Sequence, residues 1–180
     1  MSELRVFDEA DSARARVHTR EFDTIRRELG EVGIRFERWE ASRPLAPGAS
    51  QDEVLAAYQA PVRRLMEERG LQSVDVLGMV PDHPQREAMR AKFLEEHTHS
   101  EDEVRFFVEG QGLFCIHKAG RVFFVLCEKG DLISVPDGTP HWFDMGPRPS
   151  FTAIRLFTNK EGWIARMTGD DIASRFPRLE

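Results

Sequence analysis

The second half of the chain consists largely of short runs that are rich in apolar, β-forming residues. From residue 97 onward these runs read VRFFVEG, GLFCIHK, RVFFVLCEKG, DLISVPDG, PHWFDMG and FTAIRLF. Turn residues separate the runs, among them Gly110 with Gly112 and Gly130 with Asp131. Several strands at such close spacing are typical of a β-sandwich or a small barrel. The pattern therefore predicts a separate strand for each run.

The first ninety residues show a mixed pattern of helix and strand. Phe22, Ile25 and Leu29 have the spacing of one face of a short helix. This helix should end near Gly30 or Gly33, because glycine is a common helix terminator. The segments GIRFERWEA and SVDVLGMV then read as strands, since apolar and polar residues alternate in the first and β-formers dominate the second.

A longer helix is predicted after the loop RPLAPGAS. Ser50 and Glu53 match a capping box, which marks the start of a helix. Apolar residues at helical spacing follow, namely Val54, Tyr58, Val62 and Leu65. Pro61 should kink or break this helix, because proline lacks the backbone donor that a helix interior requires. Asp82 with Pro84 can open one further helix before the β-rich half.

Composition and charge narrow the class of protein. With 180 residues, 41% hydrophobic and 31% charged, the chain has the composition of a globular domain. A formal net charge of −6 argues against a general nucleic-acid binder. No apolar run approaches the roughly 18 residues of a membrane span, and the charged N-terminus lacks the apolar core of a signal peptide. Cys115 and Cys127 both lie in apolar runs, so we expect core packing in a reducing cytoplasm rather than a disulfide.

The stretch EEHTHSEDEVRFFVEG places two histidines and a carboxylate at the start of a predicted strand. Side chains alternate between the two faces of a strand, so His97 and His99 should point the same way. Glu103 has the same parity and follows the short bend SED. Such a pair of histidines alone is more typical of a solvated turn, but His141 follows a tight turn at Gly138 and should project into the same interior. The four donors together predict one metal site.

Three imidazoles and one carboxylate form a ligand set that suits Fe(II), Ni(II), Mn(II), Co(II) or Zn(II). An octahedral ion would keep two neighbouring positions for a bidentate ligand. Arg105 has the strand parity of Glu103, so it should face the same cavity and favour an anion there. Arg155 lies in an apolar run, which suggests a second buried anion partner, although an edge-strand arginine facing water would explain it too. His117 is expected to be an exposed hairpin residue.

These motifs resemble the two conserved motifs of the cupin superfamily. The first, His-x-His-x3-Glu-x6-Gly, falls on His97, His99, Glu103 and Gly110. The second, Gly-x5-Pro-x-Gly-x2-His, falls on Gly130, Pro136, Gly138 and His141. Many cupins carry Asn four residues after the last histidine, where this chain has Met145. That position is not a metal ligand, so the departure leaves the ligand set intact.

Within the cupins, the segments EEHTHSEDEVRFFVEGQGLF, VPDGTPHWFDMG and IRLFTNKEGW are similar to the acireductone dioxygenase family. The resemblance implies a mainly β fold, a single cupin barrel (double-stranded β-helix or jelly roll) with an N-terminal α/β extension and flanking helices. We therefore expect a single domain over residues 1–180. The extension should cover about 1–93, the barrel core about 94–160, and a C-terminal helix or tail about 161–180.

The resemblance also implies roles for individual residues. The metal ligands would be His97, His99, Glu103 and His141. Arg105 would act in catalysis, because a neighbouring cation favours the substrate dianion. The substrate-binding side chains would be Arg105, Arg155, Phe106, Phe143 and Trp163. Glu96 would assist metal incorporation and Asp102 would relay a local conformational change, although solvated loop acids would explain both, just as core packing would explain Phe106 and Phe143.

The implied enzyme is a metal-dependent dioxygenase of methionine salvage. Its substrates would be O2 and acireductone, 1,2-dihydroxy-3-keto-5-methylthiopentene. One Fe(II) per chain would give formate and 4-methylthio-2-oxobutanoate, whereas one Ni(II) would give formate, carbon monoxide and 3-methylthiopropanoate. A cytoplasmic monomer without nucleic-acid or membrane partners is expected. The alternatives are another cupin enzyme, acting as a dioxygenase on a different enediol or as a sugar-phosphate isomerase, and a non-catalytic ligand sensor.

Overall fold

The computed structural model describes residues 1–180. The first half of the chain alternates strands and helices, which are β1 (Glu3–Asp8), β2 (Asp11–Thr19), α1 (Phe22–Gly30), β3 (Arg35–Arg38), α2 (Gln51–Ala57), α3 (Gln59–Arg69), β4 (Ser73–Met79) and α4 (Arg86–Phe93). The second half is β-rich and contains β5 (His97–Thr98), β6 (Glu103–Lys118), β7 (Arg121–Glu128), β8 (Asp131–Val135), β9 (His141–Asp144), β10 (Phe151–Phe157), β11 (Arg166–Met167) and α5 (Ile172–Arg175).

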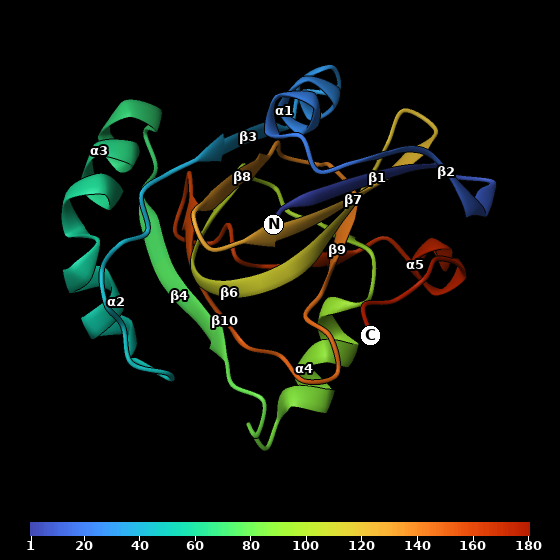
Figure 1. The fold of residues 1–180 in the computed structure, drawn as a ribbon. Helices are drawn as coiled ribbons and strands as arrows, with labels where there is room; N and C mark the ends of the chain where they lie inside the picture. Colours follow the sequence, from blue (N-terminus) through green and yellow to red (C-terminus); the bar gives the residue numbers. More distant parts are fainter.

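Strand β6 is central because two sets of strands meet on it (Figure 1). Its first part, residues 103–110, pairs with β10 and β8, and its second part, residues 111–118, pairs with β7 and β9. One side therefore has the order β4-β10-β6-β8-β3, and the other has β11-β5-β9-β6-β7-β1-β2. All of these pairs are antiparallel. The mainly β fold predicted from the sequence is confirmed.

The prediction of two strands separated by a turn at Gly110 and Gly112 was wrong. The runs VRFFVEG and GLFCIHK form one strand of 16 residues that bends at its middle. Val108 is an extra residue in the pairing with β10, and Gly110 has a φ of +68°. A bulge and a glycine in this conformation bend a strand without ending it. The bend lets one strand belong to both sides of the fold.

The first 93 residues add strands to both sides. Strand β1 pairs with β7, β3 pairs with β8, and β4 pairs with β10. Figure 1 shows α2 and α3 on the outer side of β4, and α1 beside β3. The α/β extension therefore completes the sheets of the β-rich half. The single domain with its segment bounds stays a prediction, which these pairings across residue 93 favour.

The predicted helices are confirmed, with shifted ends in two cases. Ser50 and Glu53 form the capping box at the start of α2. The helix breaks at Tyr58, three residues before Pro61, because a proline ring clashes with the carbonyl four residues earlier. Helix α4 begins at Arg86 and not at Asp82, and no side chain caps it.

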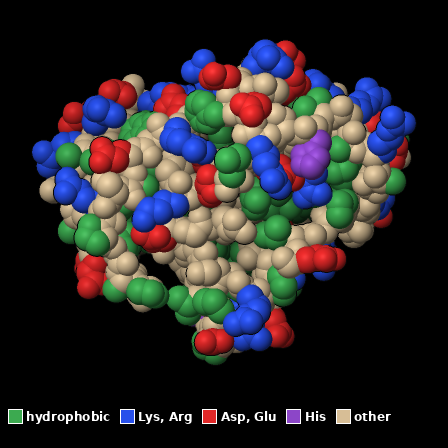
Figure 2. Space-filling view, viewed as in Figure 1, with side chains coloured by type: hydrophobic (Ala, Val, Ile, Leu, Met, Phe, Trp, Pro, Cys, Tyr) green, Lys and Arg blue, Asp and Glu red, His purple; other side chains and the backbone are tan.

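Three apolar clusters hold the fold together. The largest has 21 buried residues from both sides of the fold, the second packs α2 and α3 onto β4, β6 and β10, and the third packs α5 onto β7 and β9. Both cysteines are buried and free, as expected from the sequence. On the face in Figure 2, basic and acidic side chains are intermixed over the surface. Exposed ion pairs of this kind contribute little to stability, so the apolar clusters carry most of it.

None of the helices has the length and apolar character that crossing a membrane would require.

Replacing Gly110 with alanine should destabilise the fold strongly. The added Cβ would lie 1.8 Å from the carbonyl oxygen of Ser150, at a φ of +68° that L side chains rarely adopt. We expect the free energy of unfolding, measured by urea denaturation, to fall by about 3 kcal/mol or more. Gly120→Ala is the matched control, since Gly120 has a φ of +71° but no atom within 4 Å of the added Cβ. Its expected cost is about 1 kcal/mol. Equal losses would contradict a role for the close approach to Ser150.

Candidate metal centre

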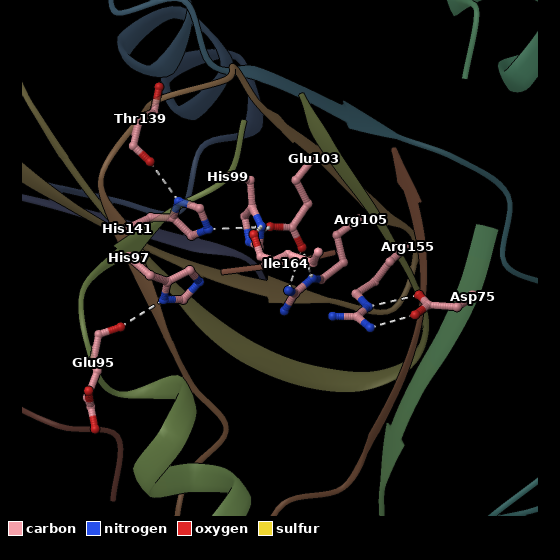
Figure 3. Close-up of polar contacts among 10 residues, drawn as sticks. All are labelled: Asp75, Glu95, His97, His99, Glu103, Arg105, Thr139, His141, Arg155 and Ile164. Atoms are coloured by element: carbon pink, nitrogen blue, oxygen red, sulfur yellow. Dashed lines mark hydrogen bonds and ion pairs between the residues drawn. The ribbon is translucent and has the colours of Figure 1, made fainter. Parts of the chain in front are cut away.

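The structure brings together the four side chains that the sequence suggested as metal ligands (Figure 3). His97 on β5 lies opposite His141 on β9, and ligand nitrogens of these two residues and His99 lie within 4.8 Å of one another. Glu103, the first residue of β6, places its Oε2 atom 3.4 Å from Nε2 of His99 and 3.3 Å from Nε2 of His141. Two donors at right angles around an ion about 2.1 Å away would be about 3 Å apart. The spacing therefore suits a shared ion.

Backbone carbonyls orient all three imidazoles. The Nδ1 atom of His97 lies 2.8 Å from the carbonyl oxygen of Glu95, and that of His141 lies 2.8 Å from the carbonyl of Thr139. For His99 the partner is the carbonyl of Ile164, at 3.2 Å. A carbonyl only accepts, so each Nδ1 carries the proton and donates it. The Nε2 lone pairs are then left to bind a metal, as is usual for a metal-binding histidine.

The electrostatics favour neutral imidazoles at His97 and His99 and an ionised carboxylate at Glu103. Burial, followed by the neighbouring His141, lowers the pKa of His97 to about 4. Burial likewise lowers the pKa of His99. For Glu103 burial alone would raise the pKa, but Arg105 and the nearby histidines outweigh it and hold the pKa well below its usual range. Neutral imidazoles and an ionised carboxylate are the forms that a metal requires.

Two of these metal-binding atoms have no hydrogen-bond partner within the protein. Oε2 of Glu103 and Nε2 of His141 are buried and accept no hydrogen bond. Buried acceptors that face one another without a proton between them repel, and an unsatisfied buried polar group costs about 1–3 kcal/mol. A cation at the centre of the cluster would satisfy both. The residues therefore fit a divalent ion held by nitrogen and oxygen donors.

Arg105 lies beside the cluster and is itself buried. Its Nη2 donates to Oε1 of Glu103 at 2.6 Å, and its Nε donates to the same oxygen at 3.2 Å. The guanidinium lies 4.7 Å from the ring centres of both Phe114 and Phe143, so two aromatic faces hold it in place. The remaining nitrogen, Nη1, is buried and has no partner. This atom is available to a ligand in the neighbouring cavity.

Arg155 has an anion partner inside the protein, which the sequence analysis did not identify. Its Nε and Nη2 donate to the two carboxylate oxygens of Asp75 at 2.9 and 2.6 Å. Asp75, Arg155 and Arg105 occupy directly opposed positions on β4, β10 and β6. Two like charges side by side across strands repel, and Asp75 offsets that repulsion. The carboxylate within the apolar run SVDVLGMV was the signal for this partner.

A cavity of about 310 Å³ opens in front of the metal cluster. Polar and apolar side chains both line it. Its lining residues are Leu77, Met89, Lys92, Phe93, His97, His99, Arg105, His141, Phe143, Arg155, Trp163, Ile164, Ala165 and Met167. Two of the expected aromatic residues, Phe143 and Trp163, thus line it, and the side chain of Trp163 is 58% exposed at its mouth. This volume is within the range of small-molecule sites.

Phe106 does not line the cavity, which disagrees with the role expected for it. Its ring packs in the second apolar cluster, 5.7 Å from Trp39 and 5.6 Å from Tyr58 between ring centres. The reason is strand alternation. Arg105 faces the cavity, so the next residue faces the opposite side of β6. The resemblance alone had suggested a contact with substrate, and core packing explains Phe106.

Glu96 and Asp102 lie outside the metal cluster. Glu96 is buried, and its carboxylate bonds to His117 at 2.9 Å and to Thr168 at 2.7 Å. Asp102 accepts a hydrogen bond at 2.9 Å from the backbone of Asp137, in the turn before β9. The first residue therefore braces the strand that carries His97, and the second links the loops on either side of the site.

His117 is not the exposed hairpin residue that the sequence suggested. Its two ring nitrogens lie 2.9 Å from carboxylate oxygens of Glu96 and Glu9. Burial alone would lower the pKa of His117, but these two carboxylates outweigh it and raise the pKa. His117 does lie next to a turn, as the sequence indicated. The two carboxylates that cover its imidazole, however, come from residues 21 and 108 positions away along the chain.

Several residues of the site carried no sequence signal. Phe114 stacks on the His141 ring with 5.6 Å between ring centres and also covers Arg105. Leu77 and Met89 add apolar surface to the lining of the cavity. An aromatic or apolar residue in a strand or helix is usually part of the core, so only the fold distinguishes these from the rest.

Comparisons with known proteins agree with one another. A family model described as the ARD/ARD' family matches residues 3–165. An acireductone dioxygenase of Alcanivorax borkumensis is 58% identical over 178 residues, which cover 99% of this chain and 98% of that protein. An acireductone dioxygenase of Pseudomonas aeruginosa is 58% identical over 180 residues, which cover 100% of this chain and 99% of that protein.

A solved structure is also similar to this chain. It is an acireductone dioxygenase from Bacillus anthracis with a cadmium ion in its active centre. The TM-score is 0.78 at 31% sequence identity, and the match covers 92% of this chain and 98% of that one. This similarity supports the cupin fold.

Replacing His97 or His141 with alanine should abolish metal binding. Wild-type protein is expected to gain thermal stability when a divalent metal is added, because metal binding is coupled to folding. Neither variant should show that gain, and elemental analysis should find less than about a tenth of the wild-type metal content. His18→Ala is the control, because His18 is exposed and pairs with Glu3, which is not one of the proposed ligands. Stoichiometric metal in either variant would contradict the ligand set.

Proposed function

Because this chain belongs to the ARD/ARD' family, we infer that it is a metal-dependent dioxygenase of methionine salvage that cleaves acireductone with O2. The observation that carries this inference is that two of the four metal-binding atoms have no hydrogen-bond partner in the protein. Buried Glu103 Oε2 and His141 Nε2 converge beside a cavity that also receives the free Nη1 of Arg105. A cation and an anionic ligand are therefore the two occupants that this site favours.

We propose that His97, His99, Glu103 and His141 hold one Fe(II) or Ni(II) per chain. Neutral imidazole and carboxylate suit both metals, so the same ligands serve either. The bound metal would supply Lewis-acid and redox chemistry for the reaction of the substrate with O2. The cytoplasmic monomer expected from the sequence is likewise a proposal.

The charge of the site supports a dianionic substrate. The charges of a divalent ion and of the Glu103 carboxylate sum to one positive charge, and the guanidinium of Arg105 adds a second. Arg155 adds none, because the carboxylate of Asp75 neutralises it. The site therefore carries two positive charges in excess, which matches an enediolate that has lost two protons. A cation nearby lowers the pKa of an acidic group, so Arg105 would favour the ionised substrate.

We assign the remaining contacts by the polarity of the cavity. Nη1 of Arg105 would donate a hydrogen bond to a substrate oxygen, since it is buried without another partner. Phe143 and Trp163 would cover the enediolate and exclude water. The apolar residues Leu77, Met89 and Phe93 would contact the methylthio tail. The protein thus supplies orientation, charge stabilisation and an apolar slot.

Oxygen consumption and product identification test the activity. We expect Fe(II)-loaded protein to consume one O2 for each acireductone and release formate and 4-methylthio-2-oxobutanoate. Ni(II)-loaded protein should release formate, carbon monoxide and 3-methylthiopropanoate. Metal-free protein is the control. An isomerase would need no O2, so a metal-loaded protein that leaves the oxygen electrode unchanged would exclude the dioxygenase.

Replacing Arg105 with alanine should separate charge stabilisation from metal binding. The metal content should stay stoichiometric, because Arg105 is not a ligand. We expect kcat/KM to fall by about 100-fold or more, since one buried charge-stabilising donor is typically worth that much. Arg105→Lys should restore part of the activity by keeping the charge. If Arg105→Ala loses its metal, the role of Arg105 is structural.

A further inference from the structure

Helix α4 forms one wall of the cavity, and it packs against the largest apolar cluster only through the partly buried Met89 and Phe93. It contributes Met89, Lys92 and Phe93 to the lining. No residue of this eight-residue helix is fully buried, and Gln85 at its start makes no capping bond with its side chain. Such a short helix is not stable by propensity alone. Its position must be held by contacts with the rest of the protein.

An ion pair between the partly buried Arg90 and the buried Asp144 contributes to that hold. Asp144, at the end of β9, is 1% exposed. Its Oδ1 accepts from Nε of Arg90 on α4 at 2.8 Å, and its Oδ2 accepts from Nη2 at 3.1 Å. The backbone N–H of Gly146 also donates to Oδ1, at 2.8 Å. A two-pronged contact of this kind fixes both distance and orientation.

The C-terminal tail closes the same network. The backbone N–H of Leu179 donates to Oδ2 of Asp144 at 2.9 Å, and the carbonyl of Leu179 accepts from Nη2 of Arg90 at 2.8 Å. The Leu179 side chain packs against the cluster under α5. Figure 1 shows the chain end beside α4. Arg90 thus contacts β9 and the tail at once, and α4 cannot move without breaking both contacts.

We propose that Arg90 and Asp144, closed by Leu179, form a clamp that positions α4 and thereby sets how tightly the cavity holds the apolar tail of its substrate. The proposal rests on the proposed function for the identity of that substrate. Arg90 and Asp144 are positioning residues, because neither lines the cavity.

The geometry links the clamp to the substrate-binding wall in two ways. Phe143, which neighbours Asp144 on β9, contacts Phe93 of α4 with 6.2 Å between ring centres. Met89 and Phe93, on either side of Arg90 in the sequence of α4, both line the cavity. A shift of α4 would therefore loosen the contact with the methylthio group. The proposed metal ligands lie outside α4, and Asp144 is at the opposite end of β9 from His141. We therefore expect Arg90→Leu to leave the metal content unchanged.

The kinetic test compares two substrates in metal-loaded protein. One is acireductone, and the other is the same enediol ketone without its methylthio group. We expect Arg90→Leu and Asp144→Asn to raise KM for acireductone about tenfold, with less than twofold change for the truncated substrate and little change in kcat. Arg90→Lys should restore part of the loss. Arg86→Leu is the matched control, since Arg86 pairs only with the exposed Glu87 on the same helix.

Hydrogen exchange provides a readout that does not require activity. Amides of residues 86–93 and 176–180 should exchange faster in Arg90→Leu and Asp144→Asn than in wild type or Arg86→Leu. Unchanged exchange in both variants, or an equal rise in KM for the two substrates, would overturn the clamp. If wild-type protein turns over neither substrate, the proposed function fails, and the exchange data still decide whether the clamp positions α4.

Discussion

The lone pairs of the clustered imidazoles and of the Glu103 carboxylate face one another in a buried space, so they require a cation between them. The rest of the site depends on this constraint. Three imidazoles present Nε2 atoms because backbone carbonyls take their Nδ1 protons. The Glu103 carboxylate completes the set, and two of the four donors have no other partner. Without a cation this arrangement would cost free energy at the two donors that lack a partner, Glu103 Oε2 and His141 Nε2. The fold tolerates the cost because it positions the donors on strands rather than on loops alone.

Charge balance is the second requirement of the site. Arg105 and Arg155 lie directly opposite each other on neighbouring strands, where like charges repel. Glu103 binds the first arginine, and Asp75 binds the second. These carboxylates hold the two guanidinium groups in place beside each other. With a divalent metal bound, the site would carry two positive charges, which match the two negative charges of a dianionic ligand.

The bend of β6 joins these parts into one site. The first half of β6 carries Glu103 and Arg105 and pairs with β10, which carries Arg155. The second half pairs with β9, which carries His141. Two separate strands would not need to keep this geometry, whereas one continuous strand fixes the two halves relative to each other. The clamp on α4 extends the same principle to the apolar wall.

The sequence by itself determined the β-rich character, the capped helix at Ser50 and the set of four donors with Arg105. The strand parity and the spacing within each motif are local, because they depend on residues a few positions apart. The approach of His141 to the other three donors is long-range and comes from the pairing of β9 with β5 and β6. Only the tertiary structure decided that β6 bends without a break, that Asp75 neutralises Arg155, and that Phe106 belongs to the core. It also decided that Asp144 joins Arg90 and Leu179, which lie 54 and 35 residues away along the chain. Partners so distant leave no periodic trace in the sequence, since their contact arises from how the strands and the tail pack.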